Sequence, residues 1–263
     1  RPLALPSGHN SVKRRSKSVG ELIHCDVFGP TRAPSVTGGY RYWITFIDDY
    51  SRRLWVYLLL ERKHAVRAFQ QFVCDFAAAR RGRPALYYVI DNYAPFISRI
   101  RTDNAGELVG SNSPFASYLR DAKVQHEFSP PHVHQLNGVA ERMNRTIANA
   151  VRSAVADAAL PRSFWGYAAM AFPFVHNHLP NAGNPSHKSP MQMWPGGHAE
   201  LPTVASLRPF GSVVFSHLPW EQREDGDKLA AMSEKGVLVG YQAGSAAYKI
   251  YFPARKKTLM RYH

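Results

Sequence analysis

The pattern of hydrophobic residues predicts β-strands in the first 60 residues and a helix directly after them. Runs at 22–28, 40–47 and 54–60 are rich in aromatic and β-branched residues, which favour strands. Polar turn residues lie between the second and third runs, so the three runs predict an antiparallel meander. Residues 64–79 then place apolar side chains at helical spacing. We expect three strands followed by one helix.

Two more strand candidates follow, and each ends at a break in the pattern. The first, 97–102, runs into an Asp-Asn turn, and the second, 124–128, is stopped by two prolines. Residues 113–122 between them have a helical pattern. Residues 80–97 fit neither period: they are basic at the start and hold one short strand candidate, 86–90. We interpret them as an insertion or an elaborated loop.

A long amphipathic helix begins near Val139, and a second helix, rich in aromatic residues, spans 163–177. The apolar stripe predicted for the first helix consists of Val139, Met143, Ile147, Val151 and Ala154. At about 100° per residue, Glu141 lies roughly 200° from Val139 and points away from this stripe. The residues on the same side of the helix as Glu141 are Arg145, Ala148 and Arg152.

The composition changes after the second helix. Proline, glycine, asparagine and serine dominate as far as Pro202, which predicts a connector with a short helical piece at 190–194. The short strands predicted beyond it form a small β-barrel and lie at 212–217, 236–241, 247–252 and 257–261. The four predicted segments are a basic linker at 1–19, a core at 20–178, a connector at 179–206 and the barrel module at 207–263.

The net charge of the chain indicates what kind of partner it binds. The chain has 263 residues, of which 45% are hydrophobic, enough for a substantial core. Lys and Arg number 33 against 19 Asp and Glu, so the formal net charge is 33 − 19 = +14. Such an excess indicates a polyanionic partner, and nucleic acid is the first candidate. The basic cluster near the N-terminus is either a solvated tail or a phosphate-binding arm, and it consists of Lys13, Arg14, Arg15 and Lys17.

Cysteine usage and hydropathy exclude several classes of protein. Cys25 and Cys74 form neither a disulfide framework nor a zinc-ligand spacing, which favours a reducing compartment. No apolar run approaches the roughly 18 residues of a membrane span, so we expect no membrane partner. The chain begins without Met, and we expect it to be a fragment of a longer protein.

Three carboxylates are candidates for chemistry. Asp26 lies inside the first predicted strand, Asp103 follows the fourth, and Glu141 lies early in the long helix. Burying an acid in an apolar strand is costly unless it has a partner. That partner is either a nearby arginine or a hard cation such as Mg²⁺, which binds one or two carboxylates together with water and phosphate. Glu141 also has a simpler explanation, because acids are favoured at the positive end of a helix dipole.

Several stretches resemble the integrases of copia-type retrotransposons, within the retroviral integrase superfamily. The stretches in the core are ELIHCDVFGP (21–30), ITFIDDYSRRLWVYLL (44–59), RTDNAGE (101–107) and NGVAERMNRTI (137–147). The later stretches are KSPMQMWPGG (188–197), LRPFGSVVF (207–215) and KGVLVGY (235–241). The resemblance covers residues 18–263. It implies an α/β fold with a ribonuclease H-like mixed five-stranded sheet and flanking helices, plus a small SH3-like β-barrel.

The resemblance also implies an activity. Asp26, Asp103 and Glu141 match the family's acidic triad, which would hold Mg²⁺ or Mn²⁺ as a pair of ions. The last two are separated by 141 − 103 − 1 = 37 residues, close to the spacing in the superfamily. The first and fourth strands would be neighbours, with Asp26 facing Asp103. The implied reaction is trimming of element cDNA ends where needed and their insertion into target DNA by two-metal phosphoryl transfer.

Further residues and partners are implied in the same way. The residues matched to DNA contacts, beside the basic N-terminal cluster, are Asn137, Arg142, Asn144 and Arg145. Asn104 and Glu107 would orient the turn after Asp103. The implied partners are element cDNA ends, target DNA, further copies of the chain in a homo-oligomer, and reverse transcriptase in a parent polyprotein. The implied site of action is the nucleus, after synthesis in the cytoplasm.

Departures from the family pattern keep two alternatives open. Ala105 replaces a glycine, His134 and Leu136 replace Pro and Gln, and residues 80–97 lengthen the gap between the two aspartates. The first alternative is a catalytically decayed DNA-binding relic of the same fold, against which the intact triad argues. The second is a ribonuclease H-like nuclease without strand transfer, against which the family-like barrel module argues.

Overall fold

Two β-sheets organise the chain, in a computed structural model that describes residues 15–81, 96–103, 106–110, 113–128, 137–195, 207–219, 232–242, 245 and 247–262. The first part contains β1 (Leu22–Phe28), β2 (Tyr42–Asp48), β3 (Leu54–Leu59), α1 (Ala65–Arg81), β4 (Arg99–Thr102), α2 (Gly106–Val109), α3 (Pro114–Asp121), β5 (Gln125–Phe128), α4 (Gly138–Asp157) and α5 (Trp165–His178). The second contains β6 (Val213–His217), β7 (Ser233–Tyr241), β8 (Ala247–Phe252) and β9 (Lys257–Tyr262). Short 3-10 turns are η1 (Arg62–His64), η3 (Arg162–Phe164) and η4 (Pro185–His187).

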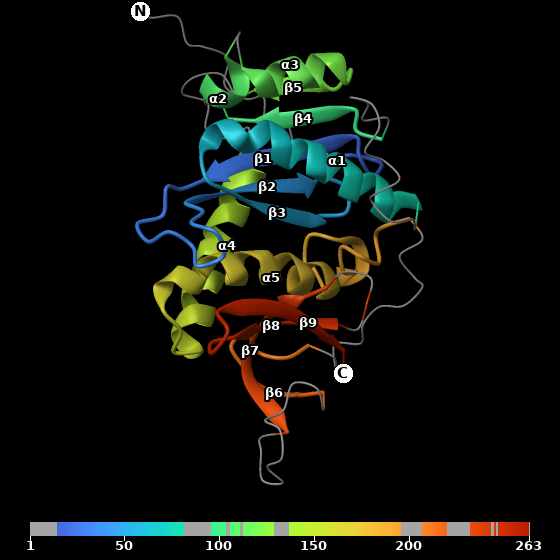
Figure 1. Cartoon of the computed structure of the whole chain (residues 1–263). Helices are drawn as coiled ribbons and strands as arrows, with labels where there is room; N and C mark the ends of the chain where they lie inside the picture. The colour runs from blue at the N-terminus through green and yellow to red at the C-terminus, as the bar shows by residue number, and fades with distance from the viewer. Residues whose placement is uncertain are drawn as a thin grey trace, which may run out of the picture.

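The first sheet has five strands in the order β3-β2-β1-β4-β5. β1, β2 and β3 form an antiparallel meander, whereas β4 pairs in parallel with both β1 and β5. In Figure 1, α1 lies over one face of this sheet and α4 crosses the other. The predicted mixed five-stranded sheet with flanking helices is therefore confirmed.

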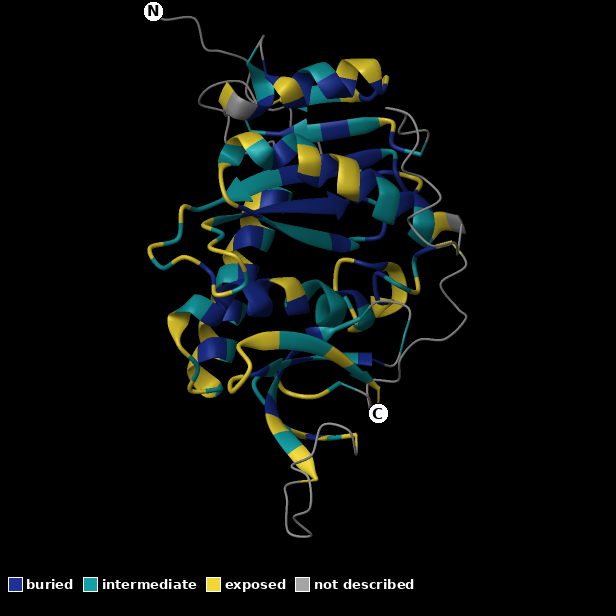
Figure 2. Cartoon of the chain, in the orientation of Figure 1, coloured by how far each residue is buried: buried dark blue, intermediate teal, exposed yellow. Residues whose placement is uncertain are grey.

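Side chains of the strands alternate between two hydrophobic clusters because successive residues point to opposite faces. Cys25 of β1 and Phe46 of β2 pack on the α1 face, where the rings of Phe46 and Phe72 stack at 4.4 Å. Trp43 and Ile47 of β2 pack on the other face, against α4 and α5. Buried residues accordingly concentrate along the strands and on the inner sides of the helices (Figure 2). By the same alternation Asp26 lies on the α4 face.

Asn177, near the end of α5, caps the edge of the sheet at β3. Its Oδ1 accepts a hydrogen bond from the Leu54 backbone N–H, and its Nδ2 donates to the Leu54 carbonyl, both at 2.9 Å. Asn177 is 8% exposed and Leu54 1%. The side-chain amide thus satisfies two backbone groups that a neighbouring strand would otherwise satisfy.

The segment after α5 packs back over the core. Trp194 is 3% exposed, and its indole Nε1 donates to the Ala79 carbonyl at 3.0 Å. Its ring meets Trp55 and Phe76 edge-on, and the Arg53 guanidinium lies 4.5 Å from its centroid. The first part of the predicted connector is therefore fixed to the core by one deeply buried side chain.

The second sheet has the order β6-β7-β8-β9, with every pair antiparallel. Its outer strands come together where Nε of Arg261 on β9 donates to Oγ of Ser216 on β6 at 2.8 Å. Leu238, Ile250 and Phe252 fill the interior that results. The sheet is thus rolled in the manner of a small barrel, as the sequence predicts.

The barrel packs directly on α5 (Figure 1). Phe174 of α5 stacks on Tyr241 of β7 with ring centroids 4.4 Å apart. Tyr251 of β8 meets the Phe164 ring edge-on at 5.1 Å. Val239 is 1% exposed and belongs to the same cluster as Trp43. One continuous hydrophobic cluster therefore joins the sheet, α4, α5 and the barrel.

Most predicted elements are present with ends shifted by at most two or three residues, and two predictions need comment. The helical piece predicted at 190–194 is wrong, because proline at 190 and 195 leaves too short a run for a helix and the residues form hydrogen-bonded turns. The strand predicted at 86–90 lies outside the described residues, as does all of the predicted insertion except its ends. The bounds of the four predicted segments stay a prediction. Among the described residues no helix is long and apolar enough to cross a membrane.

The edge cap predicts a measurable loss of stability. Asn177→Ala leaves the N–H and C=O of Leu54 without partners, so we expect the free energy of unfolding to fall by about 1–3 kcal/mol in urea denaturation. Asn149→Ala, an exposed position on α4, is the control and should change it little. Equal stability of the Asn177 variant and the wild type would show that the edge needs no cap.

Candidate active site

Two aspartates lie at the same ends of adjacent parallel strands. The register of β1 and β4 pairs His24 with Arg101. Two further steps along both strands place Asp26 opposite Asp103, which directly follows β4. The two carboxylates are also electrostatically coupled, since the charge on Asp103 raises the pKa of Asp26. The predicted adjacency of the first and fourth strands is therefore confirmed.

Asn144 on α4 holds the Asp26 carboxylate. Its Nδ2 donates to Oδ2 of Asp26 at 2.9 Å, and its Oδ1 accepts from the Trp43 indole Nε1, also at 2.9 Å. An indole N–H can only donate, so Trp43 fixes the amide with its NH₂ group toward Asp26. The other carboxylate oxygen of Asp26 accepts from the Val27 backbone N–H at 2.9 Å. Three elements, β2, α4 and β1, thus determine the orientation of one carboxylate.

The environment of Asp26 disfavours its charged form. Burial is the largest cause that raises the pKa of Asp26, and the charges of Asp103 and Glu141 act in the same direction. Against the lowering effect of the hydrogen bonds from Asn144 and Val27, the net pKa is about 6, compared with an ordinary value of 3.8. Negative charge therefore accumulates at this end of the sheet at a cost in stability. Bringing a cation between the carboxylates would relieve that cost.

Glu141 lies in the first turn of α4 and is exposed. It acts on Asp26 through its charge, but across the described ranges no three His, Cys, Asp or Glu side chains converge closely enough to hold a metal ion. Asp26 and Asp103 fit a hard divalent cation by their chemistry, since they supply carboxylate oxygens and repel one another without it. The candidate metal site therefore consists of Asp26 and Asp103, and Glu141 is coupled to Asp26 through its charge.

A groove of about 1240 Å³ begins at Asp26 and Glu141 and continues along α4. Its walls come from the end of β1, the residues after it, α4, η3 and the start of α5. Glu141, Arg145, Ala148 and Arg152 all line it, so the predicted common side of this helix is confirmed. The buried side of α4 is rotated slightly from the prediction and is centred on Ala140, Asn144, Ile147, Val151 and Val155.

Three residues that the sequence assigns to DNA contact have partners within the chain. Asn144 is 3% exposed and engages Asp26 and Trp43. Asn137 is 1% exposed, and its Nδ2 donates to the Cys25 carbonyl at 3.0 Å. Arg15 donates to the carbonyls of Asp49, Tyr50 and Gly183 and to Oδ1 of Asn184. The two asparagines are buried and Arg15 is half-buried, and the contact of all three with DNA stays a prediction.

The remaining predicted residues divide into two groups. Lys17, Arg142 and Arg145 are exposed, and their contact with DNA stays a prediction. Those outside the described part of the chain are Lys13, Arg14, Asn104, Ala105, His134, Leu136 and the side chain of Glu107.

Sequence reasoning missed the role of Trp43 altogether. Asn144 follows Glu141 by three residues, a spacing that places both on neighbouring parts of a helix face and could have indicated a shared site. Nothing in the local sequence pairs Trp43 with Asn144, because they are 101 residues apart.

Comparison with known proteins places these features in a family context. The chain is 34% identical to the Retrovirus-related Pol polyprotein from transposon TNT 1-94 of Nicotiana tabacum, over 93% of this chain and 17% of that protein. It is 27% identical to the Pol polyprotein from transposon RE2 of Arabidopsis thaliana, over 91% of this chain and 15% of that protein. The chain thus spans less than a fifth of these relatives.

Two further similarities concern the fold. Residues 212–263 match the family described as the retroviral polymerase SH3-like domain. A chain of the simian T-cell lymphotropic virus intasome, solved in complex with the PP2A regulatory subunit B56 gamma, superposes with a TM-score of 0.50 and 16% identity. That superposition covers 98% of this chain and 80% of the other.

The raised pKa of Asp26 predicts a pH-dependent effect of Asp26→Asn. The folded protein binds more protons than the unfolded one between 3.8 and about 6, so wild-type stability falls as pH rises through this window. Asn carries no charge at any pH and therefore lacks this loss, although its single acceptor oxygen satisfies only one of the two N–H donors that face Asp26. We expect the free energy of unfolding of Asp26→Asn relative to the wild type, measured in urea, to rise between about pH 4.5 and about pH 7.5.

Glu61→Gln is the control, because Glu61 is exposed and lies outside the groove. A stability difference for Asp26→Asn that is the same at both pH values would mean that the Asp26 carboxylate is not destabilised by its surroundings.

Proposed function

Because this chain is a relative of copia-type retrotransposon Pol polyproteins and has an integrase-like core followed by an SH3-like module, we propose that it is the integrase segment of such a polyprotein. In this role it binds element cDNA ends, trims them where needed and inserts them into target DNA by phosphoryl transfer. The observation that carries the proposal is the placement of Asp26 opposite Asp103, at the ends of β1 and β4.

The residues of the site divide the work. Asp26 and Asp103 would hold Mg²⁺ or Mn²⁺, and Glu141 would complete the ligand set for a pair of ions. When bound, such ions activate the attacking oxygen and stabilise the leaving oxygen in phosphoryl transfer. Asn144 and Trp43 keep the Asp26 carboxylate in one orientation. No protein nucleophile is needed, because water or a DNA 3′-hydroxyl attacks phosphorus.

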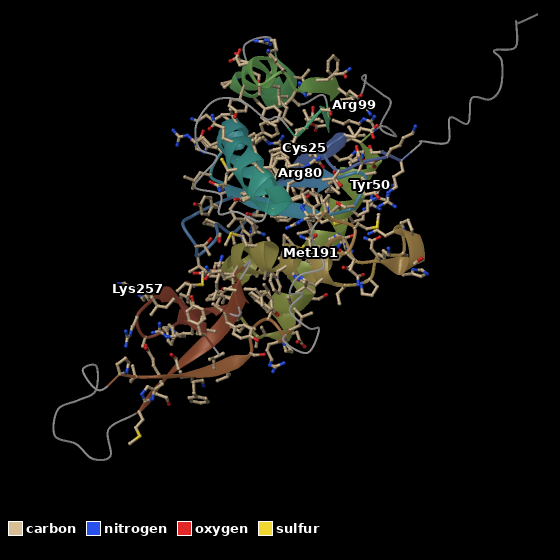
Figure 3. All side chains as sticks on the ribbon, turned by 90° about the vertical axis from the view of Figure 1, so that its right-hand side faces the viewer. Cys25, Tyr50, Arg80, Arg99, Met191 and Lys257 are labelled. Atoms are coloured by element: carbon tan, nitrogen blue, oxygen red, sulfur yellow. The ribbon has the colours of Figure 1, made fainter. Side chains whose placement is uncertain are left out.

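Positive charge on the surface would hold the DNA. Basic side chains occur on both parts of the chain, for example Arg80 on α1 and Lys257 on β9 (Figure 3). Arg142 and Arg145 project from the exposed side of α4, next to Glu141. Each phosphate that they neutralise releases counterions, which favours binding at low salt.

The proposal includes the wider context of the reaction. The chain would act as a homo-oligomer on host chromosomal DNA in the nucleus, after synthesis in the cytoplasm with reverse transcriptase in one polyprotein. The names of the relatives support the polyprotein part of this context.

A DNA-binding relic and a nuclease without strand transfer are the alternatives. A relic would bind DNA without cutting it, and a nuclease would cut without joining. A strand-transfer assay with labelled ends and a plasmid target separates the three outcomes. The buried hydrogen bonds around Asp26 favour an active site, because a relic has no need to orient that carboxylate.

Asp103→Asn tests the metal site. We expect strand transfer to fall roughly a thousandfold, since several kcal/mol of transition-state stabilisation disappear with the ligand. Calorimetry should show Mn²⁺ binding to the wild type and much weaker binding to the variant. The control is Asp121→Asn, a change at the end of α3 outside the groove, which should leave both properties unchanged. Equal Mn²⁺ binding by Asp103→Asn and the wild type would remove the metal from this site.

A second pair of variants decides which glutamate completes the site. Glu141→Gln should lower strand transfer with Mg²⁺ by roughly a thousandfold if Glu141 binds metal. Glu107→Gln should lower it by about ten- to a hundredfold if Glu107 only orients the turn after Asp103. An active Glu141→Gln enzyme together with an inactive Glu107→Gln enzyme would exchange the two assignments.

A further inference from the structure

The groove beside the candidate active site extends well past the carboxylates. It follows α4 from Glu141 to Ala156, a length of about 22 Å at 1.5 Å per residue, and ends near Leu160 and Arg162. Its volume of about 1240 Å³ exceeds the roughly 300–1,000 Å³ of pockets that hold one drug-sized ligand. The space therefore suits an extended ligand that starts at the carboxylates and runs along the helix.

The wall opposite α4 is held in place by hydrogen bonds. Nε1 of Trp165 donates to the Ala33 carbonyl at 2.9 Å. The backbone N–H of Val36 donates to the Ser163 carbonyl at 2.8 Å. The residues that follow β1 are thereby tied to the start of α5, and these bonds fix the wall of the groove opposite α4.

Four exposed arginines stand along the groove. They are Arg32, Arg145, Arg152 and Arg162. Within the described ranges none of the four forms an ion pair with a carboxylate, although Arg152 hydrogen-bonds to its own helix. Past Asp26 and Glu141 the lining is otherwise uncharged, so this part of the groove is complementary to a chain of negative charges.

The floor between these arginines is apolar. Phe28, Ala148 and Leu160 are partly exposed there and Ala156 is exposed. Phe28 stacks on Trp43 with ring centroids 4.0 Å apart and an angle of 16° between the planes. A flat ring that is stacked on one face and partly exposed provides a surface on which another flat ring can stack.

We infer that this groove binds a short unpaired stretch of DNA, with its bases on the apolar floor and its phosphates at the arginines. The inference deepens the proposed function, on which it rests, by naming the form of DNA that the active site receives. A positively charged groove with apolar and aromatic residues between the charges is the pattern by which proteins hold single strands. Duplex DNA keeps its bases stacked inside and presents phosphates outward, so it would leave the apolar floor unused.

The first experiment compares a single strand with a duplex. We would measure fluorescence anisotropy with labelled dT12 and with a hairpin duplex that has the same number of phosphates. The groove variant is Arg152→Gln/Arg162→Gln. Its control is Arg67→Gln/Arg120→Gln, which removes the same charge from exposed positions on α1 and α3.

We expect the groove variant to bind dT12 about tenfold more weakly and the control to bind it like the wild type. The slope of log affinity against log salt should become shallower by about 0.7 for each phosphate that the protein no longer neutralises. Equal weakening in both double variants, or equal weakening for dT12 and the hairpin, would mean that the groove does not hold a single strand.

The second experiment tests the floor. Ala156→Glu places a carboxylate inside the groove, and Ser153→Glu places one on the same helix outside the lining. Only Ala156→Glu should weaken dT12 binding. An abasic strand of equal length should bind the wild type at least about tenfold more weakly than dT12, because it has phosphates but no bases to stack. Equal binding of the two strands, or displacement of dT12 by polyglutamate as readily as by unlabelled dT12, would favour an acidic peptide and overturn the inference.

These binding measurements do not depend on catalysis. If strand transfer is absent but dT12 binds in the groove as described, the inference holds and the proposed function fails. If strand transfer occurs and the groove variants still bind dT12 like the wild type, the inference fails and the proposed function holds.

Discussion

The parallel pairing of β1 with β4 is the constraint on which the rest of this structure depends. It brings together two aspartates that are far apart in the sequence, Asp26 near the end of β1 and Asp103 directly after β4. The pairing has an electrostatic cost, because burial and the neighbouring charges raise the pKa of Asp26 to about 6. The packing of the rest of the fold must offset this loss of stability. Because strongly shifted pKa values cluster at functional sites, Asp26 and Asp103 are the first candidates for the active site.

This packing comes from aromatic residues on both sides of the sheet. On one side α1 covers a cluster of stacked rings, and on the other α4 and α5 share a cluster with the barrel. This second cluster links the hydrophobic core to the candidate active site, because Trp43 belongs to the cluster and also donates the hydrogen bond that orients Asn144. The position of Asp26 is therefore set by the same contacts that hold α4 and the barrel in place.

Local sequence patterns predicted the elements well because strand and helix periods depend on neighbouring residues. The order of the elements and the acids then carried the family resemblance and, through it, the topology. The patterns could not reveal long-range side-chain partners. Asn144 was expected at DNA and is buried against Asp26, and Arg15 was expected in a phosphate-binding arm and is held by backbone carbonyls. The sequence missed these partners for one physical reason, since a polar residue on a basic stretch gives no local sign of an acceptor far along the chain.

The most direct test of the central claim is the position of a divalent ion in the folded protein. In a crystal soaked with Mn²⁺ and a short DNA end, anomalous scattering identifies manganese without reference to any assumed ligand. We expect a manganese peak between the carboxylates of Asp26 and Asp103. Manganese bound elsewhere, with no peak at these two carboxylates, would contradict the assignment of this site to metal-dependent phosphoryl transfer.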